Sequence, residues 1–269
     1  MHCAPLPDRL AAIAPPTTLP LHWRRAFTLA VGCLLLAGCT KVTDGTVTAA
    51  RGLQLGPISG ATLQKVLPTE SELADVLGES IPADADEPLF EGKLSDMADG
   101  LATESDASPH DCVGVIAELQ RSVYQDTKMS EFASARWRQP SGSGSDLTRV
   151  VTAVVAFPTT SESNDAFDAF AKQWQKCDGT FVKIPFESDY FGDDISNVKN
   201  EDGVVSAGYE VTRATNSIAW PNLRAIGVRA NCLVEVEVTF YDGPAAPSEF
   251  KDSAIAVARS MMDRIAEVG

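Results

Sequence analysis

The chain has 269 residues, of which 44% are hydrophobic and 22% are charged, as is usual for a globular protein with one core of moderate size. Acidic residues outnumber basic ones by 37 to 22, which gives a formal net charge of −15. Nucleic acid and anionic lipid head groups are poor partners for such a surface, so neither is expected to bind.

The N-terminal region has the pattern of a bacterial lipoprotein leader. Two arginines precede an apolar stretch, 26–38, which is too short to cross a bilayer because a membrane helix needs about 20 apolar residues. Residues 36–39, Leu-Ala-Gly-Cys, resemble a lipobox, the motif at which the leader is cut and the cysteine receives its lipid. The sequence therefore predicts a signal peptide over 1–38 and lipid attachment at Cys39, where several acyl chains give stable anchoring.

An ordinary leader that leaves Cys39 as a free thiol is the alternative. Residues 1–21 contain five prolines that a leader does not need, so we expect translation to begin nearer His22. Residues 39–63 are then predicted to form the lipid anchor and a flexible tether, because they are rich in Thr, Gly and Ala without a sustained apolar period. The folded domain is expected over 64–269.

A short helix and a long acidic loop are predicted next. The helix begins after Thr69, which forms a capping-box pattern with Glu72, and ends at Gly78. Acidic residues recur too often over 79–111 for a packed element, so this segment is predicted to be a solvated loop. It lacks the EF-hand spacing of oxygen ligands, and no calcium site is expected.

The middle of the chain predicts one more short helix and a hairpin. Apolar residues between Val115 and Val123 lie at helical spacing. The runs 132–139 and 147–158, the second largely apolar and β-branched, predict two paired strands. Their connection, 140–145, is rich in Ser and Gly but has no Lys and opens no helix, so a linker is a better interpretation than a phosphate loop or a nucleophile site.

The second half of the chain predicts two long helices around further strands. A helix from Thr160 to Lys176 has an apolar stripe, and a last amphipathic helix extends from Phe250 to Ile265. Strands are predicted near 181–184 and over 204–213 and 217–220, and the stretch 224–229 leads into a last strand whose alternate apolar residues extend from Val228 to Phe240. We therefore predict a single α+β domain with an antiparallel twisted sheet that helices cover on one side.

Three cysteines remain in the expected mature chain besides Cys39. Cys232 lies in a strand where every second residue is apolar, which predicts a core position. An extracytoplasmic compartment permits a disulfide, but an odd number leaves one cysteine over. A bridge between Cys112 and Cys177 closes a loop of about 65 residues, which is worth about 4 kcal/mol. No metal site is expected, because these cysteines are far apart in sequence and His110 is the only histidine after the leader.

Four motifs in a fixed order carry a resemblance to a known family. They are Cys112-Val113-Gly114-Val115, Val-Val-Ala-Phe-Pro-Thr over 154–159, Gln-Trp-Gln-Lys-Cys over 173–177, and Arg-Ala-Ile-Gly-Val-Arg-Ala-Asn over 224–231. Together they resemble the PknH-type extracellular sensor domain over most of 67–269. That domain is the outer module of bacterial Ser/Thr kinases and also occurs in freestanding lipoproteins. The resemblance implies an antiparallel sheet with helices and a large cleft that receives a ligand.

The resemblance also implies a cysteine pairing. Family members usually hold four cysteines in two bridges, and the first pair corresponds to Cys112 and Cys177. The second pair falls near Asn222 and Thr239, neither of which is a cysteine here. We therefore expect one disulfide, Cys112–Cys177, and a free, buried Cys232.

Aromatic and arginine residues of the predicted strands are the candidates for the cleft lining. They are Arg136, Trp137, Arg138, Tyr209, Arg213 and Trp220, with Tyr190 and Phe191 as further aromatics. Arg136 and Arg138 flank Trp137 and give their strand one basic face, which favours an anionic ligand if it is directed into the cleft. Core packing of the aromatics and solvation of the arginines are the alternative interpretations.

The expected function is that of a lipid-anchored, extracytoplasmic ligand-binding domain, similar to a sensor and without catalytic activity. His110 lies in a loop and is a poor base for a hydrolytic triad, although paired-carboxylate chemistry stays open in so acidic a chain. The alternatives are a lipid or glycolipid carrier, which needs a long apolar pocket, and a protein-interaction module of the envelope. No cofactor is expected. The expected partners are the membrane, through the anchor, and a small molecule, a lipid or an envelope protein.

Overall fold

The computed structural model describes residues 56–87, 89–215, 219–241 and 246–269. The chain divides into residues 1–48 and residues 49–269, and every described residue belongs to the second unit. The predicted signal peptide, Cys39 and most of the predicted tether therefore lie outside the described residues. Within the described part, no helix is long and apolar enough to cross a membrane.

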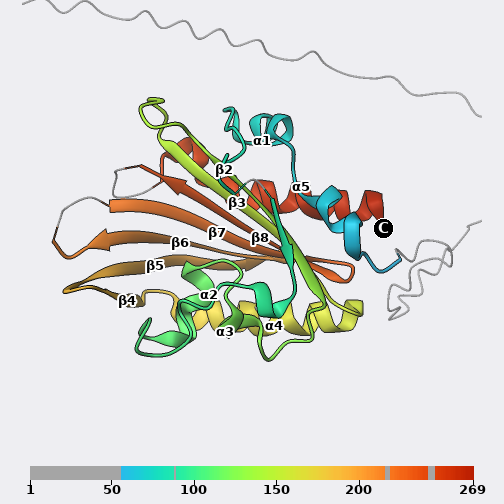
Figure 1. Ribbon diagram of the computed structural model, residues 1–269, viewed down its shortest axis with the longest axis horizontal. Coiled ribbons are helices and arrows are strands. Elements are labelled where there is room, and N and C mark those ends of the chain that lie inside the picture. Colours follow the sequence, from blue (N-terminus) through green and yellow to red (C-terminus); the bar gives the residue numbers. More distant parts are fainter. Residues whose placement is uncertain (1–55, 88, 216–218, 242–245) are drawn as a thin grey trace, which may run out of the picture. The chain divides into compact units, whose positions relative to one another are not determined.

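Eight strands form one antiparallel sheet in the order β1-β2-β3-β8-β7-β6-β5-β4 (Figure 1). They are β1 Leu89–Gly92, β2 Glu131–Arg138, β3 Leu147–Ala156, β4 Phe181–Phe186, β5 Asp189–Glu201, β6 Val204–Arg213, β7 Ala219–Arg229 and β8 Cys232–Phe240. Strands β1–β3 and β4–β8 are two meanders that join where β8 pairs with β3. This arrangement confirms the predicted α+β class with an antiparallel sheet.

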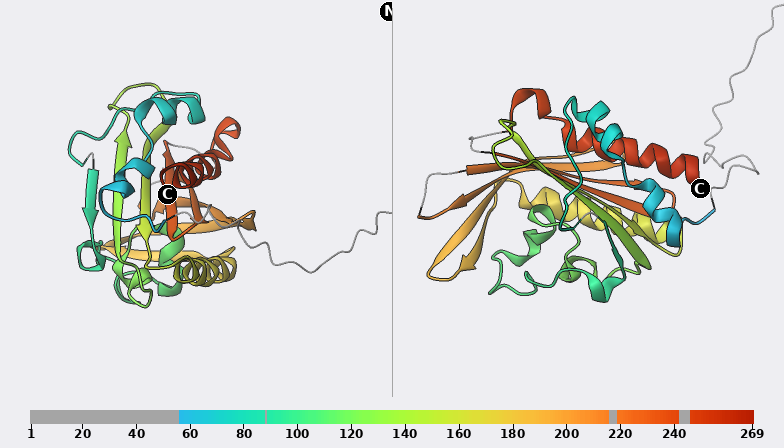
Figure 2. Two further views of the ribbon diagram at one scale, coloured as in Figure 1. Left: turned by 90° about the vertical axis from the view of Figure 1, so that its right-hand side faces the viewer. Right: turned by 45° about the horizontal axis from the view of Figure 1, so that its top comes forward.

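Helices cover both faces of this sheet. The α-helices are α1 Glu70–Leu77, α2 Val113–Ile116, α3 Arg121–Tyr124, α4 Thr160–Cys177 and α5 Ser253–Val268, and the 3-10 helices are η1 Gly60–Val66, η2 Leu94–Asp96, η3 His110–Cys112 and η4 Ser248–Phe250. Helices η1, α1 and α5 pack on one face, and α2, α3 and α4 pack on the other. Figure 2 shows α5 in red and α4 in yellow on opposite sides of the strands. We call the two sides the α5 face and the α4 face.

The prediction of helices on one side only was wrong. Both faces of the central strands β3 and β8 are buried, and consecutive residues such as Leu233 and Val234 point into different hydrophobic clusters. A strand covered on both sides loses the alternation that marks a half-solvated strand. The run 150–157 showed this loss as a nearly continuous apolar stretch.

Several local predictions are confirmed. Thr69 and Glu72 form the capping box of α1, with the Thr69 N–H donating to Glu72 Oε2 at 2.7 Å, and Gly78 ends the helix at φ 74°. The side chain of Thr159 caps α4 by accepting from the Glu162 N–H at 3.2 Å. The hairpin β2–β3 and the final helix α5 also form where they were predicted.

The folded unit begins earlier than the predicted boundary at residue 64. Ile58 and Leu63 are each 2% exposed and belong to the core under the α5 face. The Asn231 side chain accepts from the Ile58 N–H at 2.9 Å and donates to the Ile58 carbonyl at 3.0 Å. The tether prediction was wrong for these residues because their partner lies far away in the sequence.

Two further segments differ from their predictions. The acidic stretch 79–111 is packed, since it contributes the edge strand β1 and the buried side chains of Ile81 and Met97. The predicted helix 115–123 is broken into α2 and α3 at Leu119, whose φ of 49° lies in the left-handed region. A non-glycine residue adopts that conformation only when its surroundings hold it there.

Strand β5 was not predicted. Strand β7 joins the predicted strand 217–220 to the stretch 224–229, and the strand predicted from Val228 to Phe240 is divided by a turn at Ala230, whose φ is 51°. The β5 sequence is rich in Asp and Asn, which are depleted in strands, and its pairing with β6 shifts register between Ser196 and Lys199. Its position between β4 and β6 therefore depends on its neighbours and not on its own strand propensity.

All described elements, both hydrophobic clusters and the single disulfide of the described residues lie within 49–269. This unit therefore contains the interactions that it needs to fold by itself.

Candidate functional site

The α4 face of the sheet carries an ion pair in the protein interior. Arg224 of β7 is 0% exposed and donates from Nη2 to Glu235 Oε2 of β8 at 2.7 Å. The Tyr124 hydroxyl donates to the other oxygen of Glu235 at 2.5 Å. Arg224 also donates to the carbonyls of Val115 and Gly114, both at 3.3 Å, so it holds the α2 segment against the sheet. Burial is the largest effect raising the pKa of Tyr124, which keeps this hydroxyl protonated as a donor.

A second ion pair lies next to the first on the same face. Glu237, which is 1% exposed, accepts from Arg149 of β3 and from the Tyr209 hydroxyl, the latter at 2.8 Å. Burial raises the pKa of Glu237, and the neighbouring Glu118 carboxylate acts in the same direction. Two arginines, two glutamates and two tyrosines thus form one network across β3, β8, β7 and β6, which we call the buried network.

Polar atoms without partners adjoin this network. Asp193 of β5 is 3% exposed, its Oδ1 has no hydrogen-bond partner, and burial together with the Glu237 charge raises its pKa to about 7. Arg224 Nη1 is also buried without a partner. Because buried polar groups in native proteins are nearly always paired, these atoms make this region a candidate for a functional site.

A cavity of about 430 Å³ opens beside the network, between β1, β2 and the segment that joins α2 to α3. Its lining combines the apolar side chains of Leu89, Phe90, Met97, Leu119 and Phe132 with the polar side chains of Glu118, Ser134 and Arg136. Leu89 and Phe90 are 45% and 49% exposed, so apolar surface is available to a bound molecule at this cavity. We call it the β1–β2 cavity.

Glu118 and Arg136 connect the cavity wall with the buried network. Their side chains are 3.7 Å apart, and Arg136 also pairs with Glu87. The charge of Glu118 raises the pKa of both Arg149 and Glu237, which places it within electrostatic range of the second ion pair. The next residue, Leu119, holds its left-handed conformation in the cavity wall. The strained backbone of Leu119 and the charge of Glu118 therefore lie next to each other in the wall of the β1–β2 cavity.

The predicted cleft residues divide between the two faces. The register puts Arg136, Arg138, Tyr209, Arg213 and Trp220 on the α4 face. Trp137 lies on the opposite face, is 4% exposed and packs in the core under α5, so it does not line the β1–β2 cavity. The alternation of a strand puts Trp137 on the other side from its two arginine neighbours, and this side is the hydrophobic one.

The remaining candidates do not meet at one point. Arg136 lines the β1–β2 cavity and Tyr209 belongs to the buried network, whereas Arg213 pairs with Asp189 at 3.3 Å near the other edge of the sheet. Strands β2 and β6 are four positions apart in the sheet order, which corresponds to about 19 Å. The six residues therefore do not form a single ligand site.

The basic strand face is neutralised by carboxylates. Arg136 pairs with Glu87 and Glu118, and Arg138 pairs with Asp84 at 2.8 Å. A ligand here meets paired charges instead of free cations. The predicted preference for an anionic ligand therefore loses its main support.

The sequence interpretation missed the central residues of the network. Glu235 and Glu237 alternate with valines in β8, a pattern that normally means a solvated polar face, yet both are buried. Their burial comes from the second layer of helices, α2 to α4, over this face, which the sequence of β8 does not display. Arg224 and Asp193 had no local signal either.

The cysteines are arranged as the resemblance implied. Cys112 and Cys177 form a disulfide with a Cα–Cα distance of 5.7 Å, and Cys232 is free and buried. Burial raises the pKa of the Cys232 thiol to about 12. Asn222 and Thr239, where relatives hold their second pair, are directly opposite each other across β7 and β8.

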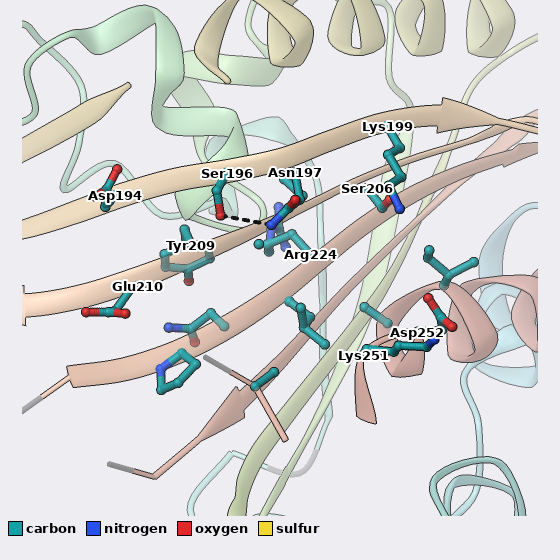
Figure 3. A pocket seen from close by; sticks show the side chains of 18 residues that line it. Asp194, Ser196, Asn197, Lys199, Ser206, Tyr209, Glu210, Arg224, Lys251 and Asp252 are labelled. Atoms are coloured by element: carbon teal, nitrogen blue, oxygen red, sulfur yellow. Dashed lines mark hydrogen bonds between the residues drawn. The ribbon is translucent and has the colours of Figure 1, made fainter. Parts of the chain in front are cut away.

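A separate cavity of about 450 Å³ lies on the α5 face, between β5–β7 and the start of α5 (Figure 3). The carboxylates of Asp194 and Glu210, which are register partners, lie at one end, and Lys199 and Lys251 lie toward the other. Burial and the Asp194 charge raise the pKa of Glu210. This cavity has charges of both signs, and Tyr209 and Arg224 of the buried network are also among the residues that line it.

No group of three or more potential metal ligands occurs among the described residues. His110 lies in η3, where its Nε2 is 3.1 Å from the Leu101 carbonyl oxygen. It is therefore engaged with the backbone of a neighbouring loop, and no serine or cysteine hydrogen-bonds to its ring in the described structure.

Comparisons with known proteins agree with this fold. The family model of the PknH-like extracellular domain matches residues 58–264. The crystal structure of the extracellular domain of PknH from Mycobacterium tuberculosis is similar with a TM-score of 0.62 and 22% identity, covering 79% of this chain and 99% of that one. An uncharacterized protein from Mycobacterium smegmatis gives a TM-score of 0.38 and 11% identity, covering 72% of this chain and 96% of that one. No curated protein matches the chain.

Proposed function

Because the chain belongs to the family of PknH-like extracellular domains, we propose that it is a lipid-anchored, extracytoplasmic domain that binds a small molecule, as a sensor does, without catalysing a reaction. The family supports the location outside the membrane. The lipobox supports anchoring through Cys39. In this proposal a partner protein detects the bound state.

The observation that carries the proposal is the buried network that reaches the wall of the β1–β2 cavity. Replacing a buried ion pair by well-packed apolar residues is often neutral or stabilising, so stability alone is a poor reason to keep Arg224 and Glu235 in the interior. A rigid array of donors and acceptors beside a cavity is what a specific binding site requires. None of the six network residues lines this cavity; the polar wall residues Glu118, whose charge acts on the second ion pair, and Arg136 are the ones that a ligand can contact directly.

The cavity favours a small amphiphilic molecule over a lipid. Its volume of about 430 Å³ falls within the range of about 300–1,000 Å³ that holds drug-sized ligands. Phe90 and Phe132, whose ring centroids are 5.5 Å apart, offer an aromatic surface, and Arg136 and Glu118 offer polar contacts at the other side. A carrier of lipid or glycolipid, the alternative, needs a longer apolar cavity than this one.

The arrangement of the carboxyl groups supports binding over catalysis. Each of the two network glutamates already accepts from an arginine and a tyrosine. Asp193, whose pKa is about 7, is 3% exposed and does not line the β1–β2 cavity. A general acid or base must reach its substrate within hydrogen-bond distance, and none of these groups does so from its present position.

Native mass spectrometry of the protein purified from the envelope of its own bacterium tests the proposal. We expect an adduct with the mass of a small molecule that is lost on denaturation. The variant Ala98→Trp, at an exposed position of the cavity lining, places an indole in the cavity and should remove the adduct. The matched control, Ala256→Trp on the exposed side of α5, should keep it.

The alternatives give different results in the same measurement. An adduct with the mass of a lipid with two acyl chains supports the carrier. A bare protein mass from several growth conditions refutes the small-molecule proposal and favours a protein-interaction module.

A further inference from the structure

A groove of about 510 Å³ lies on the outer side of α4, between this helix and the segment from η3 to the end of α3. We call it the α4 groove. Its floor is apolar and consists of Val123 together with Ala166, Ala169, Phe170 and Trp174 of α4. Ala169 is exposed and Val123 is half-buried, whereas Ala166, Phe170 and Trp174 are at most 8% exposed and lie beneath them. The groove shares no lining residue with the β1–β2 cavity.

The groove follows one stripe of α4. The lining residues of this helix, from Glu162 to Trp174, recur at intervals of three and four positions, so they lie on one side over three turns. At 1.5 Å per residue this stripe is about 18 Å long. A groove of that length matches a helix of three turns better than it matches a compact small molecule.

Carboxylates surround the apolar floor. Asp111, Asp126, Glu162 and Asp165 line the groove, and the only lysine in its lining, Lys128, is 3.3 Å from Glu162 and neutralises it. Asp111, Asp126 and Asp165 are exposed, and none of the ion pairs of the described residues includes them. The rim therefore has three uncompensated negative charges around an apolar floor.

We propose that the α4 groove is a docking site for a basic amphipathic helix of an envelope protein. The apolar side of such a helix covers Val123 and Ala169, and its lysines or arginines meet the three aspartates. A second copy of this chain fits less well, because two molecules with a net charge of −15 repel each other.

The groove is held open before a partner arrives. The disulfide Cys112–Cys177 joins its two walls at one end, and Gln173 Nε2 donates to the Asp111 carbonyl at 3.1 Å close by. Arg224 supports the far side of one wall through the Gly114 and Val115 carbonyls. Preorganised walls lower the ordering cost of binding, which favours a groove of this kind as a docking surface.

The proposal is independent of the small-molecule site. The partner helix binds the α4 groove and not the β1–β2 cavity, so its docking is measurable whether or not that cavity binds a ligand. Loss of the adduct proposed above and loss of peptide binding are therefore separate results.

The test uses residues 49–269, the unit that folds by itself, and a synthetic peptide of about 14 residues with leucines at helical spacing and lysines elsewhere. Amide chemical shifts in NMR locate the site, and calorimetry measures the affinity. We expect shifts at 162–174 and around Val123. A peptide with glutamates in place of the lysines should not bind, and a scrambled Leu/Lys peptide with the same charge should bind at least about tenfold more weakly.

A matched pair of variants separates docking from attraction to the acidic surface as a whole. Ala169→Arg introduces a cation into the floor, and Ala256→Arg introduces the same cation on the exposed side of α5. The first should weaken binding about tenfold or more and the second should leave it within about twofold. Equal effects of the two variants would overturn the proposal. Concentration-dependent shifts at 162–174 without peptide would overturn it too, by assigning the groove to self-association.

Discussion

Replacing Arg224 by methionine removes one partner of the buried ion pair and keeps most of the apolar stem. Glu235, which is 2% exposed, then stays in the interior without its countercharge. Breaking a buried pair in this way costs about 3–5 kcal/mol, because the remaining charge keeps its desolvation penalty and loses its partner. We therefore expect the free energy of unfolding of Arg224→Met to fall by about that amount.

A second substitution separates charge from packing. In Arg224→Met/Glu235→Gln the amide is neutral, and its oxygen still accepts from the Tyr124 hydroxyl. The bonds that remain lost are those of Arg224 to backbone carbonyls, which are long, at 3.3–3.4 Å, and are worth about 1 kcal/mol or less each. The double variant should therefore lose only about 1–2 kcal/mol, less than the single variant.

Chemical unfolding with the disulfide intact, followed by tryptophan fluorescence, measures these free energies. The single variant Glu235→Gln completes the double-mutant cycle, and equal dependence on denaturant concentration across the four proteins checks that the unfolded states are comparable. Additive losses, with the double variant less stable than Arg224→Met, would refute the reasoning, because they would mean that Glu235 is not an uncompensated charge when the arginine is absent.

Three further predictions concern other parts of the structure. The pKa of Asp193 is raised to about 7 from an ordinary value of 3.8, so the folded protein holds this proton more tightly and stability falls as pH rises through that window. The free energy of unfolding of Asp193→Asn, relative to that of the wild type, should therefore rise between about pH 4 and pH 7, by at most about 4 kcal/mol. Denaturation experiments that give the same difference at all these pH values would contradict this. Asn222→Cys/Thr239→Cys should form a cross-strand disulfide that adds up to about 3 kcal/mol, and two titratable thiols in the oxidised native variant would disprove it. Cys232 should resist alkylation at neutral pH until the protein unfolds, and rapid labelling of the native protein would show that it is not buried.

Local signals in the sequence were enough to predict several of the structural elements. The capping box of Thr69 and Glu72, the stripe of α4 and the turn-rich linker between β2 and β3 each depend on residues close together in the chain. Interactions of this kind act within one or two turns or one hairpin, so the sequence specifies them without reference to the rest of the fold.

The candidate site depends on contacts that the sequence does not display. Arg136, Tyr209 and Trp137 were predicted at the cleft from their residue types, but Trp137 packs in the core on the other face, because a strand pattern does not say which face lines a cavity. The second layer of helices changed the meaning of Glu235 and Glu237 from a solvated edge to a buried network.

The sequence by itself therefore determined the class of the fold, most of its elements and the resemblance that implied the disulfide, whereas lipid attachment at Cys39 stays a prediction. Only the tertiary structure decided that both sheet faces are covered, that β5 exists, and that Arg224, Glu235 and Asp193 lie in the interior. The reason is physical: helix caps and strand periods are local, whereas the burial of a charge and the choice of its partner depend on chain segments about 100 residues away, such as Val115 beside Arg224.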